Sequence, residues 1–122
     1  KYCFHYPHEL NISAMEEAAG YLIGTHDFAG FTDKKDEITT IRTIYDIIIE
    51  KQDSKIRMEY YGTGFLYHMV RILTGTLLEV GTGEKRPEEA AAALEAGNRE
   101  YAGFLAPARG LFLKEVYYNK GR

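Results

Sequence analysis

Three stretches of the chain show the three-to-four-residue spacing of apolar positions that is typical of amphipathic helices. The first opens with the capping box Ser13-Ala-Met-Glu16 and stops before Gly24, a residue suited to a helix C-terminus. The second is predicted over residues 65–80. The third is short and rich in alanine, and it begins at Pro87 and ends at Gly97.

Strands are predicted where apolar and polar positions alternate. These stretches are residues 2–6, 41–49, 55–61 and 111–118. Residues 25–39, between the first helix and the second strand, are predicted to be a loop. In the third strand Ile56, Met58 and Tyr60 share one face, which we expect to be buried.

The resulting order, β-α-β-β-α-(α)-β, is typical of the split βαβ arrangement. It predicts an α+β domain of ferredoxin-like or RRM-like type, in which a four-stranded antiparallel sheet carries its helices on one face. The 122 residues suit one domain. The other sheet face is then free to meet a second sheet, an RNA or a protein partner.

Composition narrows the possible partners and compartments. The net charge of −3 gives no broad positive field, so an RNA site must be a local patch or be shared with another chain. A single cysteine, Cys3, excludes an internal disulfide and suits a reducing cytosol. No apolar stretch is long enough for a membrane span. The chain begins at Lys1 without a methionine, so we expect a piece of a longer protein.

Arg71 lies opposite the apolar stripe of the predicted helix 65–80, and no carboxylate stands three or four residues away. One interpretation is a solvated surface arginine. The other is an arginine whose anionic partner comes from outside the helix, which Tyr67 and Leu78 favour because they suggest a second burial surface on that side. Gly75 costs the helix about 1 kcal/mol relative to alanine, so a close-lying backbone or ligand is expected there.

Other candidate residues each have two interpretations. His26-Asp27-Phe28 is either an acid–base pair or, as we prefer, a hydrogen-bonded cluster that orders its loop. His68 is more typical of a packing or surface histidine than of a base. Six cations are candidate phosphate contacts, although each alone fits a solvated charge: Lys34, Lys35, Arg42, Lys85, Arg86 and Arg109.

Four motifs, in order, resemble the tRNA pseudouridine synthase A (TruA-type) family. They extend over nearly the whole chain: Tyr-Leu-Ile-Gly-Thr-His-Asp-Phe from Tyr21, Arg-Thr-Ile from Arg42, Gly-Phe-Leu-Tyr-His-Met-Val-Arg from Gly64, and Ala-Pro-Ala-Arg-Gly-Leu-Phe-Leu from Ala106. Two positions depart from the family pattern. Leu105 replaces a common threonine, and Asn98 replaces a common aspartate.

The resemblance implies two ferredoxin-like halves that enclose an active-site cleft and convert uridine to pseudouridine at positions 38–40 of the tRNA anticodon arm. It implies a cytoplasmic homodimer that needs no cofactor or metal. A nucleophilic aspartate attacks the nucleoside, and Arg71 matches the arginine that pairs with it. Phe65, Leu66, Tyr67 and His68 are then expected to form the active-site wall. The expected RNA contacts are His26, Arg42, Lys34, Lys35 and Arg109.

The family's aspartate lies in an Arg-Thr-Asp-Ala-Gly-type segment that these residues do not contain. Residues 1–122 are therefore expected to be the C-terminal, cleft-forming domain, inactive alone, with Arg71 exposed and either mobile or paired with a solvent anion. Two alternatives are a non-catalytic RNA-binding module of RRM-like fold and a dimerisation domain. The aromatic RNP1 pattern of an RRM is absent from the sequence.

Overall fold

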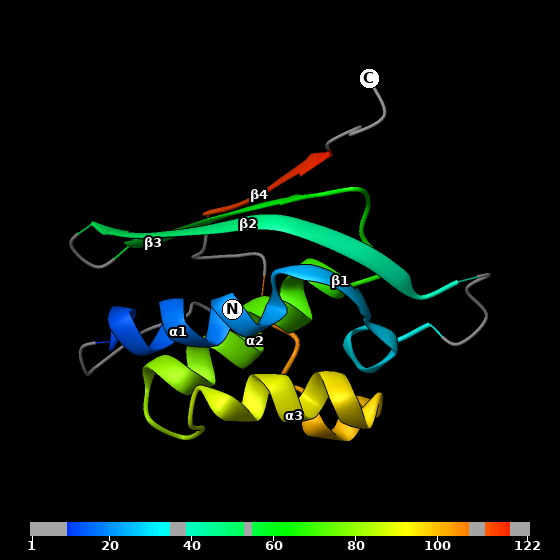
Figure 1. Ribbon diagram of the computed structural model, residues 1–122. Helices are drawn as coiled ribbons and strands as arrows, with labels where there is room; N and C mark the ends of the chain where they lie inside the picture. The colour runs from blue at the N-terminus through cyan, green and yellow to red at the C-terminus, as the bar shows by residue number, and fades with distance from the viewer. Residues whose placement is uncertain (1–9, 35–38, 53–54, 108–111, 118–122) are drawn as a thin grey trace.

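The computed structural model describes residues 10–34, 39–52, 55–107 and 112–117. Its elements follow the order α1, β1, η1, β2, β3, α2, α3, η2 and β4 (Figure 1). Here η marks a single 3₁₀ turn, at Ala29–Phe31 for η1 and at Arg99–Tyr101 for η2. The predicted strand over residues 2–6 lies outside the described residues.

Four strands form one sheet in the order β1-β2-β3-β4. Neighbours among β1, β2 and β3 pair antiparallel, whereas β4 pairs parallel to β3. The α+β class is thus confirmed, but the expectation of a wholly antiparallel sheet is wrong for this last pair. A parallel neighbour needs a long crossover, and two helices separate β3 from β4. The strand bounds are Gly24–Asp27, Ile41–Gln52, Lys55–Gly62 and Phe112–Tyr117.

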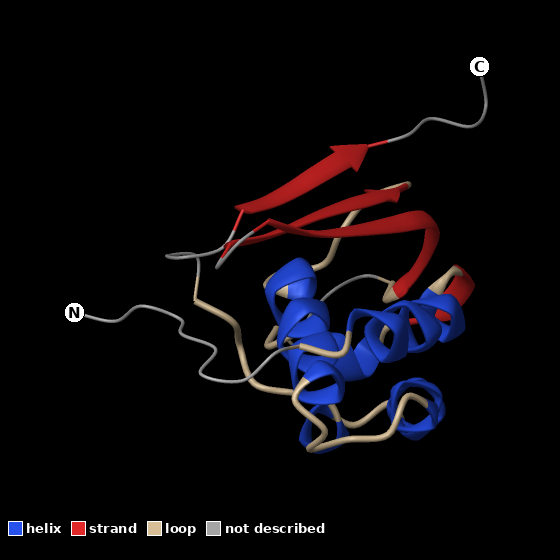
Figure 2. Cartoon of the chain, turned by 90° about the vertical axis from the view of Figure 1, so that its left-hand side faces the viewer, coloured by secondary structure: helices blue, strands red, loops and turns tan. Residues whose placement is uncertain are grey.

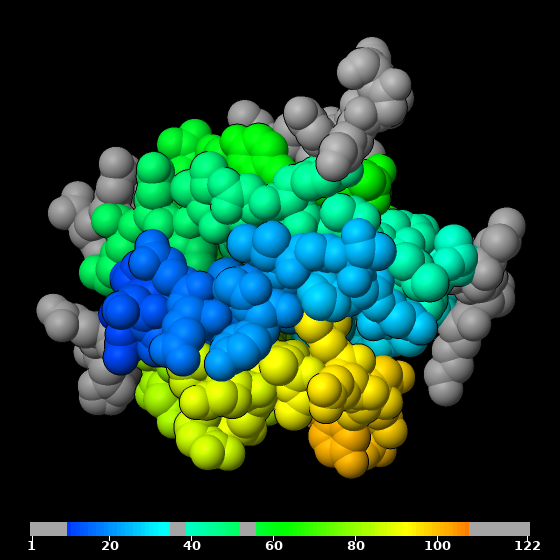
Figure 3. Space-filling view, viewed as in Figure 1, coloured from blue at the N-terminus to red at the C-terminus, as the bar shows by residue number. Residues whose placement is uncertain are grey.

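The three helices lie on one face of the sheet, as predicted (Figure 2). They are α1 (Ile12–Leu22), α2 (Met69–Gly81) and α3 (Glu88–Ala96). In the space-filling view, α1 and then β1 cross the molecule between the longer strands and α3 (Figure 3). The helix α3 ends at Gly97 in a left-handed conformation, as its sequence predicts.

The first helix begins earlier than its sequence suggests. Asn11 is the N-cap, because its side-chain oxygen accepts a hydrogen bond from the backbone N–H of Ala14 at 3.0 Å. The predicted capping box at Ser13 is therefore wrong, and Ser13 lies inside the first turn. The apolar face predicted for this helix is buried at Met15 and Leu22.

Part of the predicted loop 25–39 is ordered structure. Residues 24–27 form β1, and Ala29–Phe31 form a 3₁₀ turn. Four residues are too few to show a clear alternation, and β1 is defined instead by its pairing with the start of β2.

A register shift between Ile44 and Asp46 breaks the simple alternation predicted for β2. This β-bulge puts Ile44 on the buried face together with Ile47 and Ile49, while Ile41 stays 55% exposed. In β3 the prediction is confirmed, because Ile56, Met58 and Tyr60 are all buried.

The core lies between the helices and the strands β2 and β3. Tyr60 contributes the largest fully buried side chain, and its hydroxyl lies 2.7 Å from the Thr74 hydroxyl on α2. Burial raises the pKa of Tyr60 well above its ordinary value, so this hydroxyl stays protonated and serves as a packing and hydrogen-bonding group.

Candidate functional site

The helix that carries Arg71 begins at Met69, four residues later than predicted. Before it, the backbone N–H of Met69 donates to the Leu66 carbonyl at 3.0 Å, which closes a separate turn. His68 is the N-cap, with φ 63° and ψ 6°. Among the described residues it is the only non-glycine with a positive φ. Such a backbone costs of order 1–3 kcal/mol and persists only where surrounding contacts enforce it.

The four residues predicted to form an active-site wall therefore belong to this turn and not to a helix. Leu66 is buried, Phe65 and His68 are half-buried, and Tyr67 is 52% exposed. The Tyr67 ring stacks on the His68 ring with centroids 3.8 Å apart and planes inclined by 25°. The turn thus presents a paired aromatic surface beside the first turn of α2.

Arg71 is half-buried and anchored, which corrects the expectation of an exposed side chain. Its Nε donates to the Ala106 carbonyl at 2.7 Å, and the Ala106 N–H donates to the Arg71 carbonyl at 3.1 Å. Within the described part of the chain no carboxylate pairs with its guanidinium. Glu59, one internal acid that could have competed, is engaged by Tyr61 and Arg57 instead.

Residues 103–106, which we call the crossing segment, pass over α2 with their backbone against the helix backbone. A Cβ placed on Gly75 would lie 1.8 Å from the Phe104 oxygen. On the other side, the Gly103 N–H donates to the Thr76 hydroxyl at 2.8 Å. The expected close approach at Gly75 is confirmed, and the approaching group is this backbone.

Asp33 links the turn before α2 to a distant part of the chain. The His68 Nδ1 donates to Asp33 Oδ2 at 2.8 Å, and the Arg99 Nε donates to Asp33 Oδ1 at 2.8 Å. Arg99 also donates to the Gly103 carbonyl at 2.7 Å. The hydrogen bond from His68, followed by Arg99, holds the pKa of Asp33 below its usual value, although partial burial opposes this.

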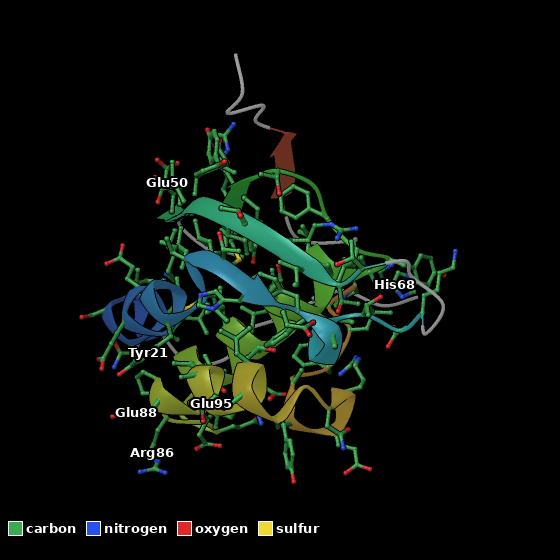
Figure 4. All side chains as sticks on the ribbon, turned by 45° about the vertical axis from the view of Figure 1, so that its right-hand side comes forward. Tyr21, Glu50, His68, Arg86, Glu88 and Glu95 are labelled. Atoms are coloured by element: carbon green, nitrogen blue, oxygen red, sulfur yellow. The ribbon has the colours of Figure 1, made fainter. Side chains whose placement is uncertain are left out.

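Sequence reasoning missed Asp33 and Arg99, because they are 66 residues apart and neither fits a local motif. A second hydrogen bond joins residues 32–33 to the turn before α2, because the Thr32 hydroxyl donates to the Tyr67 carbonyl at 2.9 Å. Figure 4 places His68 on the side of the domain opposite Glu50 and Tyr21.

The predicted RNA contacts fall into two groups. His26 on β1 lies opposite Arg42 on β2 in register. The His26 Nε2 donates to the Ile23 carbonyl at 2.9 Å, while Arg42 Nη1 donates to the Thr39 and Ile41 carbonyls. Lys34 is exposed directly after Asp33, whereas Lys35 and Arg109 lie outside the described residues.

Asp27 orders its own loop, in agreement with the preferred interpretation of this motif. Its Oδ1 accepts hydrogen bonds from the Ala29 N–H and the Thr40 hydroxyl. The neighbouring His26 ring instead meets Phe28 edge-on, with centroids 5.7 Å apart. These contacts describe a structural cluster and not an acid–base pair.

No group of three or more His, Cys, Asp or Glu side chains among the described residues could hold a metal ion. No helix in this part of the chain is long and apolar enough to cross a membrane.

Comparison with known proteins gives one consistent result. Residues 18–119 match the family model of tRNA pseudouridine synthase. The tRNA pseudouridine synthase A of Bacillus pumilus is 48% identical over 120 residues, which cover 98% of this chain and 49% of the relative. The enzymes of the same name from Acetivibrio thermocellus and Bacillus subtilis are both 46% identical, over 94% and 97% of this chain and 48% of each relative. The chain thus spans about half the length of these relatives, and it belongs to the tRNA pseudouridine synthase family.

Proposed function

We propose that this chain is the C-terminal, cleft-forming domain of a tRNA pseudouridine synthase. The enzyme would isomerise uridine to pseudouridine at positions 38–40 of the tRNA anticodon arm. The observation that carries the proposal is the state of Arg71. Its Nε is anchored on the Ala106 carbonyl, and among the described residues no acid occupies its guanidinium.

Arg71 is suited to receive a carboxylate from another domain. A guanidinium can present two N–H groups side by side to the two oxygens of a carboxylate. Because the Nε anchor fixes the plane of the group, the Nη atoms remain to hold an incoming aspartate. This aspartate would come from an N-terminal domain of the same protein.

The reaction needs a positioned nucleophile more than a strong acid or base. The aspartate attacks C1′ of the nucleoside, and the glycosidic bond to N1 breaks. The uracil then rotates, its C5 displaces the aspartate from C1′, the C5 proton leaves, and N1 takes up a proton. Arg71 would keep the carboxylate in place through these steps and favour its charged form. No step requires a metal or cofactor in this scheme.

The tRNA would meet local cations, since the chain as a whole carries a net charge of −3. Lys34 directly follows Asp33, which contacts His68 in the turn before α2. Arg42 lies near Gly64, just after β3, where its Nε is 3.8 Å from the position that a Cβ on Gly64 would take. We include His26, Lys35 and Arg109 among the proposed RNA contacts. The full protein would act as a cytoplasmic homodimer.

A chimera tests this proposal directly. The chain would replace the C-terminal half of the Bacillus subtilis tRNA pseudouridine synthase A, and turnover would be measured as tritium released from tRNA that is labelled at uracil C5. We expect the chimera to be active and the isolated chain to be inactive. Arg71→Ala in the chimera should lower the rate by orders of magnitude.

Glu95→Ala is the control, because this charged side chain is exposed on α3 and belongs to none of the proposed contacts. It should leave the rate unchanged. Turnover near the parent value in the Arg71→Ala chimera would contradict the proposal. RNA binding without turnover in the parent chimera would instead favour the non-catalytic RNA-binding module.

A further inference from the structure

We propose that Asp33 and Arg99 are positioning residues for the reaction. They hold the crossing segment against α2, and the crossing segment in turn sets the direction of the Arg71 guanidinium. The inference rests on the proposed function, since it requires that Arg71 receives a carboxylate. It adds two residues that no local motif indicates, and both act through Arg71 rather than on the substrate.

The first observation is that the peptide groups of Gly103 are held from two sides. Its N–H donates to the Thr76 hydroxyl on α2 at 2.8 Å, and its carbonyl accepts from Arg99 Nη1 at 2.7 Å. The Thr76 hydroxyl is itself fixed, because it donates to the Ile72 carbonyl one turn earlier at 2.9 Å. The direction of the chain at the start of the crossing segment is therefore set by Arg99 together with α2.

The second observation is that the crossing segment has little slack. Gly103 is bonded to Thr76. Ala106 is bonded to Arg71, five residues earlier in the same helix. This separation is about 7.5 Å along the helix axis, and three residues reach only about 10 Å when fully extended. A displacement of the Gly103 carbonyl is therefore passed on to the Ala106 carbonyl, which holds the Arg71 Nε.

The third observation is that Asp33 ties Arg99 to the start of α2. Its Oδ1 accepts from Arg99 Nε at 2.8 Å, and its Oδ2 accepts from His68 Nδ1 at 2.8 Å. His68 is the N-cap of the helix, three residues before Arg71. Because both carboxylate oxygens are engaged, one side chain fixes the crossing segment and the helix end relative to each other.

Two other roles for this pair account for less of the geometry. The Asp33 and Arg99 side chains are both 33% exposed, and ion pairs with such exposure contribute little to stability. A phosphate contact would need donors that are not already engaged, whereas Arg99 Nε and Nη1 both have acceptors within the domain. A guanidinium held between a carboxylate and a carbonyl is suited to fixing the position of a backbone.

Two variants of Arg99 in the chimera test the inference. Arg99→Lys keeps the charge and Arg99→Gln removes it, but neither side chain can donate to the Asp33 carboxylate and the Gly103 carbonyl in one fixed plane. Tritium release would give kcat and the KM for tRNA. Both variants should lower kcat about 10-fold, since a 1 Å misplacement can cost about 100-fold and a smaller shift is expected here. The KM should stay unchanged in both.

A double variant shows whether the effect passes through Arg71. In the Arg71→Lys background, Arg99→Gln should cause no further fall in kcat, because lysine has no Nε for Ala106 to hold. Two independent effects would instead multiply. Glu100→Gln is the matched control, because this exposed neighbour in η2 also loses a charge, and it should change neither constant.

The outcomes separate the two proposals. If the parent chimera is inactive, the proposed function fails, and the positioning role fails with it. With an active parent, a higher KM in Arg99→Gln that Arg99→Lys restores would make Arg99 an RNA contact and overturn the positioning role alone. An unchanged kcat overturns it as well, and so does an equal fall in kcat with and without Arg71→Lys. Should both Arg99 variants unfold, Asp33→Asn, which keeps the size of its side chain, is measured in the same two backgrounds with the same expectations.

Discussion

The β2–β3 hairpin and the turn before α2 are built in opposite ways. In the hairpin, residues close in sequence pair directly, from Gln52 with Lys55 onward, and the buried face of β3 follows from simple alternation. At the turn and the first residues of α2, by contrast, His68 is held by Asp33 and Arg71 by Ala106, each 35 residues distant. The scaffold thus depends on local apolar pattern, whereas the candidate site depends on polar contacts between distant segments.

This difference separates stability from function. A change in the hairpin removes buried contacts and should lower the free energy of unfolding. A change at the turn releases partly exposed polar groups, so it should move side chains while the fold remains. The predictions below test this separation, beginning with the largest effect.

The largest effect is expected for Arg71→Lys in the chimera. Lysine keeps the charge but has neither the Nε donor to Ala106 nor a two-pronged contact for a carboxylate. Turnover should fall about 100-fold or more, by analogy with the loss of other positioned donors. Tritium release and urea unfolding would be measured on the same sample. If the variant is largely unfolded under assay conditions, the separation of function from stability does not hold here.

The next effect concerns the crossing segment. Gly75→Ala would put a methyl group 1.8 Å from the Phe104 oxygen, so the crossing segment must shift. We expect a loss of about 3 kcal/mol in the free energy of unfolding, at the upper end of the usual cost of overpacking.

Gly20→Ala is the matched control for this variant. Gly20 also lies in a helix, but a Cβ there meets nothing within 4 Å. Alanine should therefore stabilise α1 by up to about 1 kcal/mol. Equal urea midpoints for the two variants would mean that the crossing segment moves away from α2 at no cost in stability, which would contradict this prediction.

A smaller effect is expected in the scaffold. Tyr60→Phe removes the hydroxyl that lies 2.7 Å from Thr74 in the core, and it should cost about 1 kcal/mol of stability. Tyr101→Phe, at an exposed position, should cost nothing measurable. Thermal unfolding of both would show the difference. A loss of turnover in the chimera that carries Tyr60→Phe would contradict the division between scaffold and site.

The smallest effect concerns pH. The folded-state pKa of Asp33 is lowered, so its contacts add stability above the pKa of the unfolded chain, and this stability is lost as pH falls through the folded value. Since the groups are partly exposed, Asp33→Asn should cost only about 0.5 kcal/mol near neutral pH. In urea unfolding, the difference from the parent should shrink as the pH falls below about 4 and vanish once the pH is below the lowered folded-state pKa of Asp33. A difference that persists in acid would exclude the carboxylate charge as its cause.

Much of the fold follows from the sequence, and the failures have physical reasons. The face of β3, the end of α3 at Gly97 and the close approach at Gly75 were all predicted, because each depends on neighbouring residues. The start of α2 was predicted at residue 65, four residues too early. The apolar spacing continues upstream of Met69, but the left-handed backbone of His68 prevents the helix from extending that far. The parallel pairing of β4 was missed for a similar reason, because strand order is not contained in local periodicity.

The candidate site was predictable only in part. Arg71 stands out in the sequence because no acid lies near it in the helix. In the described residues of the structure, too, no carboxylate pairs with its guanidinium. Its anchor on Ala106 and the Asp33–Arg99 contact were not predictable. Both join segments whose separation is far larger than any helix or strand period.

The contact between Gly75 and the crossing segment also bears on how this domain can change over time. Side chains in the core can be exchanged for others of different volume, and helices then move to accommodate them. At this contact the two touching parts are main chain, whose dimensions are the same for every residue. The spacing between the helix and the Ala106 carbonyl is therefore set by covalent geometry. Sequence drift in the core should leave the position of the arginine unchanged, so long as both glycines, Gly75 and Gly103, remain.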